Sequence, residues 1–154
     1  MKGILKWPLI IAAVVTVLRV VVERAGATDS VSNYLSVVAL HFIIGPLYFS
    51  IRIGLSEIRR PYFTLIKLIA LYVVLTRAMI LPTYWLARVY GWEQGRFGGV
   101  HSPSAFTGYI TIPFHTAALW IVASICFGGV LGSIVIAVLL RFVGSKRTGI
   151  PSQD

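Results

Sequence analysis

The chain has 154 residues, of which 57% are apolar and only 12% are charged, and its mean hydropathy is +0.85. A soluble domain carries about twice that charged fraction, so the composition predicts an integral membrane protein built as one small bundle. The net charge of +9 would favour nucleic acid as the partner of a soluble protein. In a membrane protein, basic residues gather in the loops on one side, so we expect no nucleic-acid partner.

Cysteine and histidine usage argues against the common metal centres. Cys126 is the single cysteine, so neither an intramolecular disulfide nor a cysteine-based metal site can form within the chain. The three histidines are expected at separate depths with no carboxylates beside them, which is a poor arrangement for zinc. We therefore expect no metal site.

Four apolar segments predict an all-α, polytopic membrane protein, a four-transmembrane-helix bundle that forms a single domain over residues 1–143. The spans are expected at about 4–22, 31–53, 63–90 and 112–142, followed by a polar cytoplasmic tail at 144–154. The first span has 19 residues, close to the minimum of roughly 17–20 that crosses hydrocarbon. Arg19 and Glu23 stand four residues apart, so they are expected to pair at its outer end.

The expected outer loop, residues 91–111, is the longest connection in the chain. It is rich in glycine, serine and aromatic residues and lacks the apolar run that a further span would need. A connection of this length in a compact protein is usually functional or packed as a lid.

The distribution of lysine and arginine predicts that both termini are cytoplasmic. Nine of the 14 basic residues fall at the N-terminus, between the second and third spans, and in the last segment, whereas four fall on the opposite side and Arg77 lies between. The positive-inside rule places the richer side in the cytoplasm. Since helical spans are typical of inner membranes, we expect a multi-pass protein of the cell inner (cytoplasmic) membrane, with the lipid bilayer around it.

The second and third spans each carry one stripe of polar side chains. Spacings of seven and four residues put each set on a narrow arc of its helix. The members are Tyr34, His41, Tyr48 and Arg52 on the second span, and Arg77, Tyr84 and Arg88 on the third. In a bilayer such stripes face a bundle interior, a cavity or a partner.

Arg77 is the most costly of these residues, because a guanidinium at the bilayer centre costs about 3 kcal/mol on insertion scales. His41 lies 17 residues before the hairpin tip near Ile58 and Arg77 lies 19 after it, so both are expected at similar depth. The spans contain no Asp or Glu to neutralise Arg77 there. A single buried tyrosine is more typical of hydrogen bonding between helices, but the set together predicts a site. Its expected members are Arg77, His41, Tyr84 and Tyr34, with Arg88 and His115 at its mouth.

The fourth span carries small residues at helical spacing. Ser124, Gly128 and Gly132 are four apart, which lets a second helix approach closely. The pattern predicts a helix-packing face, and it does not distinguish a contact within the chain from a homo-oligomer.

Several functions are compatible with these patterns. A basic and aromatic site favours a protein that binds or passes an anionic or carbonyl-bearing amphiphile, such as a lipid or a quinone. The alternative is a non-catalytic accessory subunit, in which Arg77 pairs with an acid of another membrane protein. A haem b anchor using His41 and His115 is disfavoured by their different depths. A small membrane enzyme stays open, although no catalytic motif is present and Ser102 and His101 lack a positioned acid.

Overall fold

The structure is a computed structural model that describes residues 3–28, 36–56, 58–93, 95–97 and 99–147. Every regular element in these ranges is helical, so the predicted all-α class is confirmed. The helices, in chain order, are α1 (Lys6–Arg24), α3 (Val37–Ala39), η1 (Leu40–Ile44), α4 (Gly45–Gly54), α5 (Pro61–Tyr90), η2 (Gly95–Phe97), η3 (Thr107–Thr111) and α6 (Ile112–Arg147).

Three helices are long and apolar enough to cross a membrane: Val37–Gly54, Pro61–Tyr90 and Thr107–Phe142. The first of them is the continuous run of α3, η1 and α4, and the last joins η3 to α6. The chain therefore has the composition and helix lengths of a membrane protein. Helix α1 has 19 residues but carries both Arg19 and Glu23 within it, and it is not among these three. A fourth span at this helix stays a prediction.

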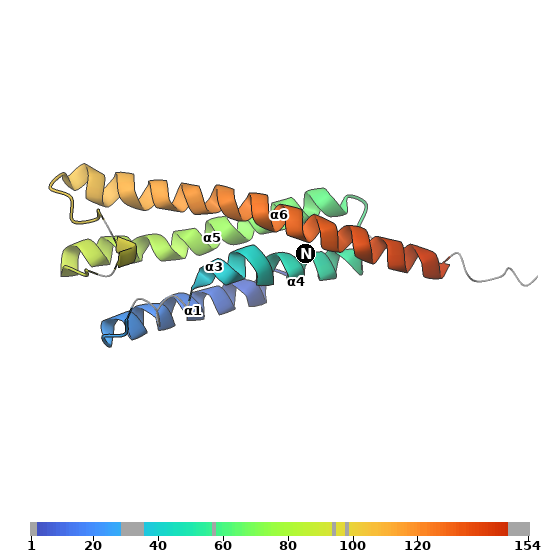
Figure 1. The fold of residues 1–154 in the computed structure, drawn as a ribbon, viewed down its shortest axis with the longest axis horizontal. Helices are drawn as coiled ribbons and strands as arrows, with labels where there is room; N and C mark the ends of the chain where they lie inside the picture. The colour runs from blue at the N-terminus through green and yellow to red at the C-terminus, as the bar shows by residue number, and fades with distance from the viewer. Residues whose placement is uncertain (1–2, 29–35, 57, 94, 98, 148–154) are drawn as a thin grey trace, which may run out of the picture.

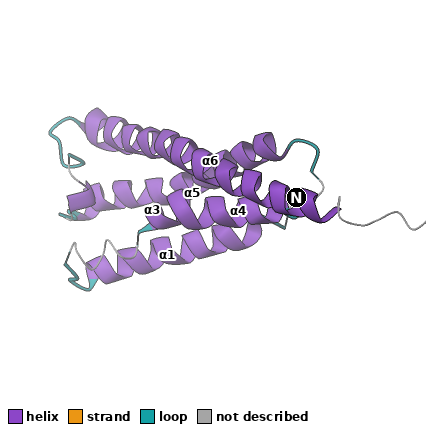
Figure 2. Ribbon diagram, turned by 45° about the vertical axis from the view of Figure 1, so that its right-hand side comes forward, coloured by secondary structure: helices purple, strands orange, loops and turns teal. Residues whose placement is uncertain are grey.

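Helix α5 occupies the middle of the bundle and contacts α1, α4 and α6 (Figure 1). Figures 1 and 2 show α6 running along one side of α5, with α1 on the other side beside α3 and α4. The connection from α5 to α6 lies at the same end of the bundle as the C-terminal end of α1. The connection from α4 to α5 and the C-terminal end of α6 lie at the opposite end.

Proline and glycine set the limits of α5. Pro61 occupies its first turn, where the missing N–H has no helical partner to lose. Gly91 ends the helix with φ of 63°, a left-handed conformation that favours glycine. The N–H of Trp92 then donates to the carbonyl of Ala87 at 2.9 Å and turns the chain back toward the bundle.

The small residues of α6 pack within the chain. A Cβ added to Gly128 would lie 2.7 Å from Cγ of Pro46, and one added to Gly132 would lie 2.6 Å from Oγ of Ser50. Ser124 is fully buried on the same face. Sequence spacing left open where this face docks, and the structure places it against α4 and α5 of the same chain.

The outer loop is folded onto the end of the bundle. Trp92, Phe97 and Val100 are all buried, and the N–H at Nε2 of His101 donates to the carbonyl of Trp92 at 2.9 Å. The guanidinium of Arg88 donates to the carbonyls of Val100 and Ser102. These contacts make the loop a packed cap over this end of the bundle.

Alanine at Gly128 should destabilise the protein, because the new Cβ meets the rigid ring of Pro46. Overpacking of this kind costs about 1–3 kcal/mol. The matched control is Gly129→Ala, since a Cβ at Gly129 has no atom within 4 Å. Thermal unfolding in detergent should show a lower midpoint for Gly128→Ala and an equal or higher one for Gly129→Ala. Equal loss in both variants would contradict the proposed packing face.

Candidate functional site

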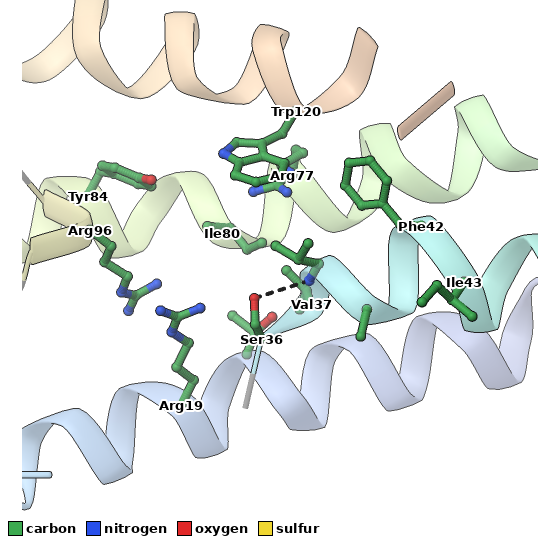
Figure 3. A pocket seen from close by; sticks show the side chains of 13 residues that line it. Arg19, Ser36, Val37, Phe42, Ile43, Arg77, Ile80, Tyr84, Arg96 and Trp120 are labelled. Atoms are coloured by element: carbon green, nitrogen blue, oxygen red, sulfur yellow. Dashed lines mark hydrogen bonds between the residues drawn. The ribbon is translucent and has the colours of Figure 1, made fainter. Parts of the chain in front are cut away.

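The first of the three membrane-length helices, Val37–Gly54, begins inside the bundle just after Ser36. This residue is extended, with φ of −97° and ψ of 133°, and its Oγ accepts a hydrogen bond from the N–H of Val38 at 3.2 Å. A serine in this position satisfies one of the four N–H groups that a helix start leaves without a partner. The helix therefore starts beside α1 and α5, with its N-terminus directed into the protein (Figure 3).

A π-helical turn, η1, interrupts this helix just before Pro46. Proline has no N–H to donate to the carbonyl four residues earlier, and its ring crowds that carbonyl, so the regular hydrogen-bond ladder cannot continue through it. A wider turn accommodates the mismatch. The turn contains His41, whose side chain is fully buried.

His41 meets Arg77, as their similar depth predicted. Nη2 of Arg77 lies 3.4 Å from Nδ1 of His41. A guanidinium can only donate, so Nδ1 accepts, and the neutral imidazole then carries its proton on Nε2. Nε2 of His41 and Nε of Arg77 have no hydrogen-bond partner within the described residues.

The guanidinium of Arg77 also lies over an aromatic ring. Its Cζ is 5.3 Å from the ring centre of Trp120 on α6, which is a cation–π distance. Arg77 is only 7% exposed. The two ion pairs found among the described residues are both formed by Glu23, and neither includes Arg77. The cation is therefore held by a weak histidine contact and an aromatic face, without a carboxylate.

Arg77 faces a cavity of about 650 Å³ (Figure 3). The cavity is bounded by α1, by the start of the helix that follows Ser36, by α5, by η2 and by α6. Its described lining consists of Thr16, Arg19, Ser36, Val37, Val38, Ala39, Phe42, Ile43, Arg77, Ile80, Tyr84, Arg96 and Trp120. Three of these side chains are guanidinium groups, and none is a carboxylate, a thiol or an imidazole.

Two further arginines meet at the outer end of the cavity (Figure 3). Nε of Arg19 lies 2.9 Å from Oε1 of Glu23, and Nη2 of Arg96 lies 2.7 Å from Oε2 of the same carboxylate. The i, i+4 pair within α1 agrees with the sequence prediction. Burial lowers the pKa of Arg96 from its ordinary value, while the charge of Glu23 opposes that change. Glu23 thus joins α1 to the outer loop.

Tyr84 completes the polar wall on α5. It is buried, lines the cavity about two helical turns beyond Arg77, and packs edge-on against the ring of Phe97 at 5.3 Å between ring centres. Figure 3 shows its hydroxyl turned toward the side of the cavity that Arg77 occupies.

Only some of the predicted site residues line the cavity. Arg77 and Tyr84 line the cavity, and His41 lies behind Arg77. Arg88 anchors the outer loop, and His115 is exposed on α6, so neither lines the cavity where a mouth was expected. Tyr34 lies outside the described residues. The ring neighbour of His41 is Tyr72, at 5.4 Å, rather than His115.

Sequence reasoning missed Arg96, Trp120 and the N-terminus of the helix after Ser36 as parts of the site. Arg96 reaches the cavity only because the outer loop folds inward, and no periodicity in the sequence signals that fold. Trp120 could have been found by extending the antiparallel pairing of the third and fourth spans inward from the outer loop.

The cavity is not closed on all sides. Ile43 lines it and is also 53% exposed at the surface of the helix bundle. Ile43 lies in η1, within one of the three helices that are long and apolar enough to cross a membrane. The remaining walls there are apolar, formed by Val37, Phe42 and Ile80. The site therefore combines a cationic, donor-rich end with an apolar wall that includes the exposed Ile43.

Comparison with known protein families, with characterised proteins and with solved structures found no match.

Removing the charge at Arg77 should leave the ligand-free protein as stable as before or more stable. A desolvated charge without an anionic partner is replaced at a gain when an apolar side chain of similar size fills its place. Arg77→Met in lipid-depleted detergent should therefore unfold at the same or a higher temperature. The matched control is Arg88→Met, which loses the donor to the carbonyls of Val100 and Ser102 and should unfold earlier. An equal loss in both variants would show that Arg77 is structural.

Glu23→Gln should loosen the outer loop, because it removes both charge-assisted contacts of Glu23 with Arg19 and Arg96. Such contacts contribute about 1.5–3 kcal/mol each, enough for a tenfold or greater rise in local opening. Hydrogen exchange at the amide of Val100 reports that opening, since this N–H donates to the carbonyl of Phe97. Glu93→Gln, at an exposed carboxylate of the same loop, is the control. Unchanged exchange in the first variant would refute the connection.

Proposed function

We propose that the protein is a multi-pass membrane protein whose cavity binds an anionic amphiphile, with the head group at Arg77. One observation supports this most strongly: Arg77 is almost fully buried, lines a cavity with two more arginines, and has no carboxylate partner within the described residues. A buried cation is stable only if a counter-charge meets it for much of the time.

The form of the cavity favours an amphiphile over a soluble anion. Its apolar wall reaches the exterior beside Ile43, at membrane depth, where a chain attached to the head group can extend into lipid. The polar end offers guanidinium groups and the hydroxyl of Tyr84, which are hydrogen-bond donors suited to oxygen atoms. A quinone carbonyl can accept such bonds, but it leaves the charge of Arg77 without a counter-ion.

The topology that this function requires has α1 as a fourth span and both termini in the cytoplasm. Support comes from the ends of the bundle: the connection between α4 and α5 and the C-terminal end of α6 share one end, and these are the arginine- and lysine-rich segments (Figure 1). The positive-inside rule then directs that end to the cytoplasm of an inner membrane. The anionic head group would lie in the outer half of the bilayer.

If the protein is instead an accessory subunit, Arg77 must pair with a carboxylate of another protein. A partner's carboxylate would have to enter the cavity to reach Arg77, because only 7% of this residue is exposed. The large uncovered apolar face of α6 is compatible with such docking and equally with lipid. The two functions differ in what co-purifies with the protein.

The test is native mass spectrometry of the full chain after mild detergent extraction. The wild type should retain an anionic lipid, and Arg77→Gln should lose most of it. A charge-assisted hydrogen bond of about 1.5–3 kcal/mol corresponds to a loss of about tenfold or more in affinity. Arg52→Gln is the matched control, because Arg52 is exposed at the end of α4 and away from the cavity. Equal lipid retention in all three proteins, or a co-purifying protein chain in place of lipid, would overturn the proposal.

A further inference from the structure

The helix that starts after Ser36 presents its N-terminus to the cavity. Ser36, Val37, Val38 and Ala39 all line the cavity wall. The first N–H groups of a helix have no partner within it, and here the Oγ of Ser36 accepts only the one from Val38. The N–H groups of Val37 and Ala39 belong to the same first turn. The helix they begin, Val37–Gly54, has 18 residues, long enough for its dipole to favour an anion at this end.

A second and independent feature directs positive charge at the same space. Arg77, on α5, lines the cavity across from this helix start, and its Nε has no hydrogen-bond partner although the side chain is buried. An unpartnered buried donor costs about 1–3 kcal/mol, so it indicates a group that the ligand supplies. The helix N-terminus and Arg77 thus form two sides of one anion subsite (Figure 3).

We propose that this subsite binds a phosphomonoester dianion, the terminal phosphate of an amphiphile, between the N-terminus at Val37 and the guanidinium of Arg77. The inference rests on the proposed function and names the head group. Backbone N–H groups at a helix start and arginine side chains are the standard means by which proteins hold phosphate.

Charge favours a dianion over a monoanion. Among the described residues no carboxylate pairs with Arg77, the helix start adds about half a positive charge, and Arg96 shares the carboxylate of Glu23 with Arg19. A phosphomonoester brings about 1.5–2 negative charges at pH 7 and three acceptor oxygens, whereas a carboxylate or a phosphodiester brings one charge. Monoanionic lipids would leave part of this positive field uncompensated.

Geometry points the same way. Donors reach the cavity from four separate elements: the helix start at Val37, Arg77 on α5, Arg96 in η2 and Arg19 on α1. Donors arranged around a volume fit a tetrahedral group, whose oxygens point in different directions, better than a planar carboxylate. The chain that carries the phosphate leaves past Phe42 and Ile43.

The experiment measures binding of defined lipids to the full chain in phosphatidylcholine nanodiscs. Phosphatidic acid, which has a phosphomonoester, should bind about tenfold more tightly than phosphatidylglycerol, which has a phosphodiester and the same glycerol backbone. Glycerol 3-phosphate carries the same phosphate without acyl chains and should bind much more weakly than phosphatidic acid.

The preference should depend on pH through the ligand. The second phosphate pKa is about 6, so the ratio of the two lipid affinities should fall toward one between about pH 7.5 and about pH 5. The charged and titratable side chains that line the cavity are Arg77 and Tyr84 from α5, Arg19 from α1 and Arg96 from η2. Glu23 contacts Arg19 and Arg96, and His41 lies behind Arg77. Protonation of these protein side chains changes the affinities for both lipids, so its effect cancels in the ratio of the two affinities.

Two variants at one position isolate the backbone donor. Val37→Pro deletes the N–H at the first position of the helix, where proline is tolerated, and the extended Ser36 before it is compatible with a following proline. Val37→Ala keeps the N–H and removes only side-chain atoms. Phosphatidic acid binding should fall about threefold to tenfold in the proline variant relative to the alanine variant, with unchanged helix content by circular dichroism.

The outcomes separate the two proposals. Equal binding of phosphatidic acid and phosphatidylglycerol, a ratio that does not change with pH, or equal binding by the proline and alanine variants would overturn the phosphomonoester subsite and leave the anionic-amphiphile function standing. Binding of neither lipid would overturn both. Glycerol 3-phosphate binding as tightly as phosphatidic acid would support the phosphate subsite and refute an amphiphile as its source.

Discussion

The burial of one guanidinium that pairs with no carboxylate in the described part of the chain is the constraint on which this structure depends. Arg77 sits within a helix of 30 residues that is long and apolar enough to span a bilayer, and its protein contacts are Nδ1 of His41 at 3.4 Å and the face of Trp120. These contacts are weaker than a carboxylate pair. The surrounding elements are arranged so that the charge faces a cavity rather than lipid.

Close helix packing and the folded outer loop build that cavity. Gly128 and Gly132 allow α6 to lie against α4 and α5, which brings Trp120 over Arg77. The π-helical turn before Pro46 places His41 against the same guanidinium. At the outer end, the inward fold of the loop delivers Arg96 to Glu23. Positive side chains therefore surround the cavity on several sides. They stabilise the folded protein less than apolar side chains packed in the same space would.

Local spacing predicted part of this arrangement. The seven-residue and four-residue intervals, together with the position of the hairpin tip, brought His41 and Arg77 together correctly because a helix has a fixed rise and turn per residue. Arg88 and His115 do not line the cavity, for a physical reason. Depth places a residue along the membrane normal, whereas its direction around the helix decides whether it meets the cavity or the exterior. Arg96 was not predictable, because its position depends on the fold of a loop whose backbone has no repeating geometry.

An experimental density map of the protein, purified with the lipids it retains, tests the account most directly. We expect non-protein density in the cavity, with oxygen atoms within about 3 Å of the guanidinium of Arg77 and of the N–H of Val37, and a chain that passes Ile43 toward the exterior. A cavity filled by the protein's own side chains, or a carboxylate of this or another chain paired with Arg77, would contradict it.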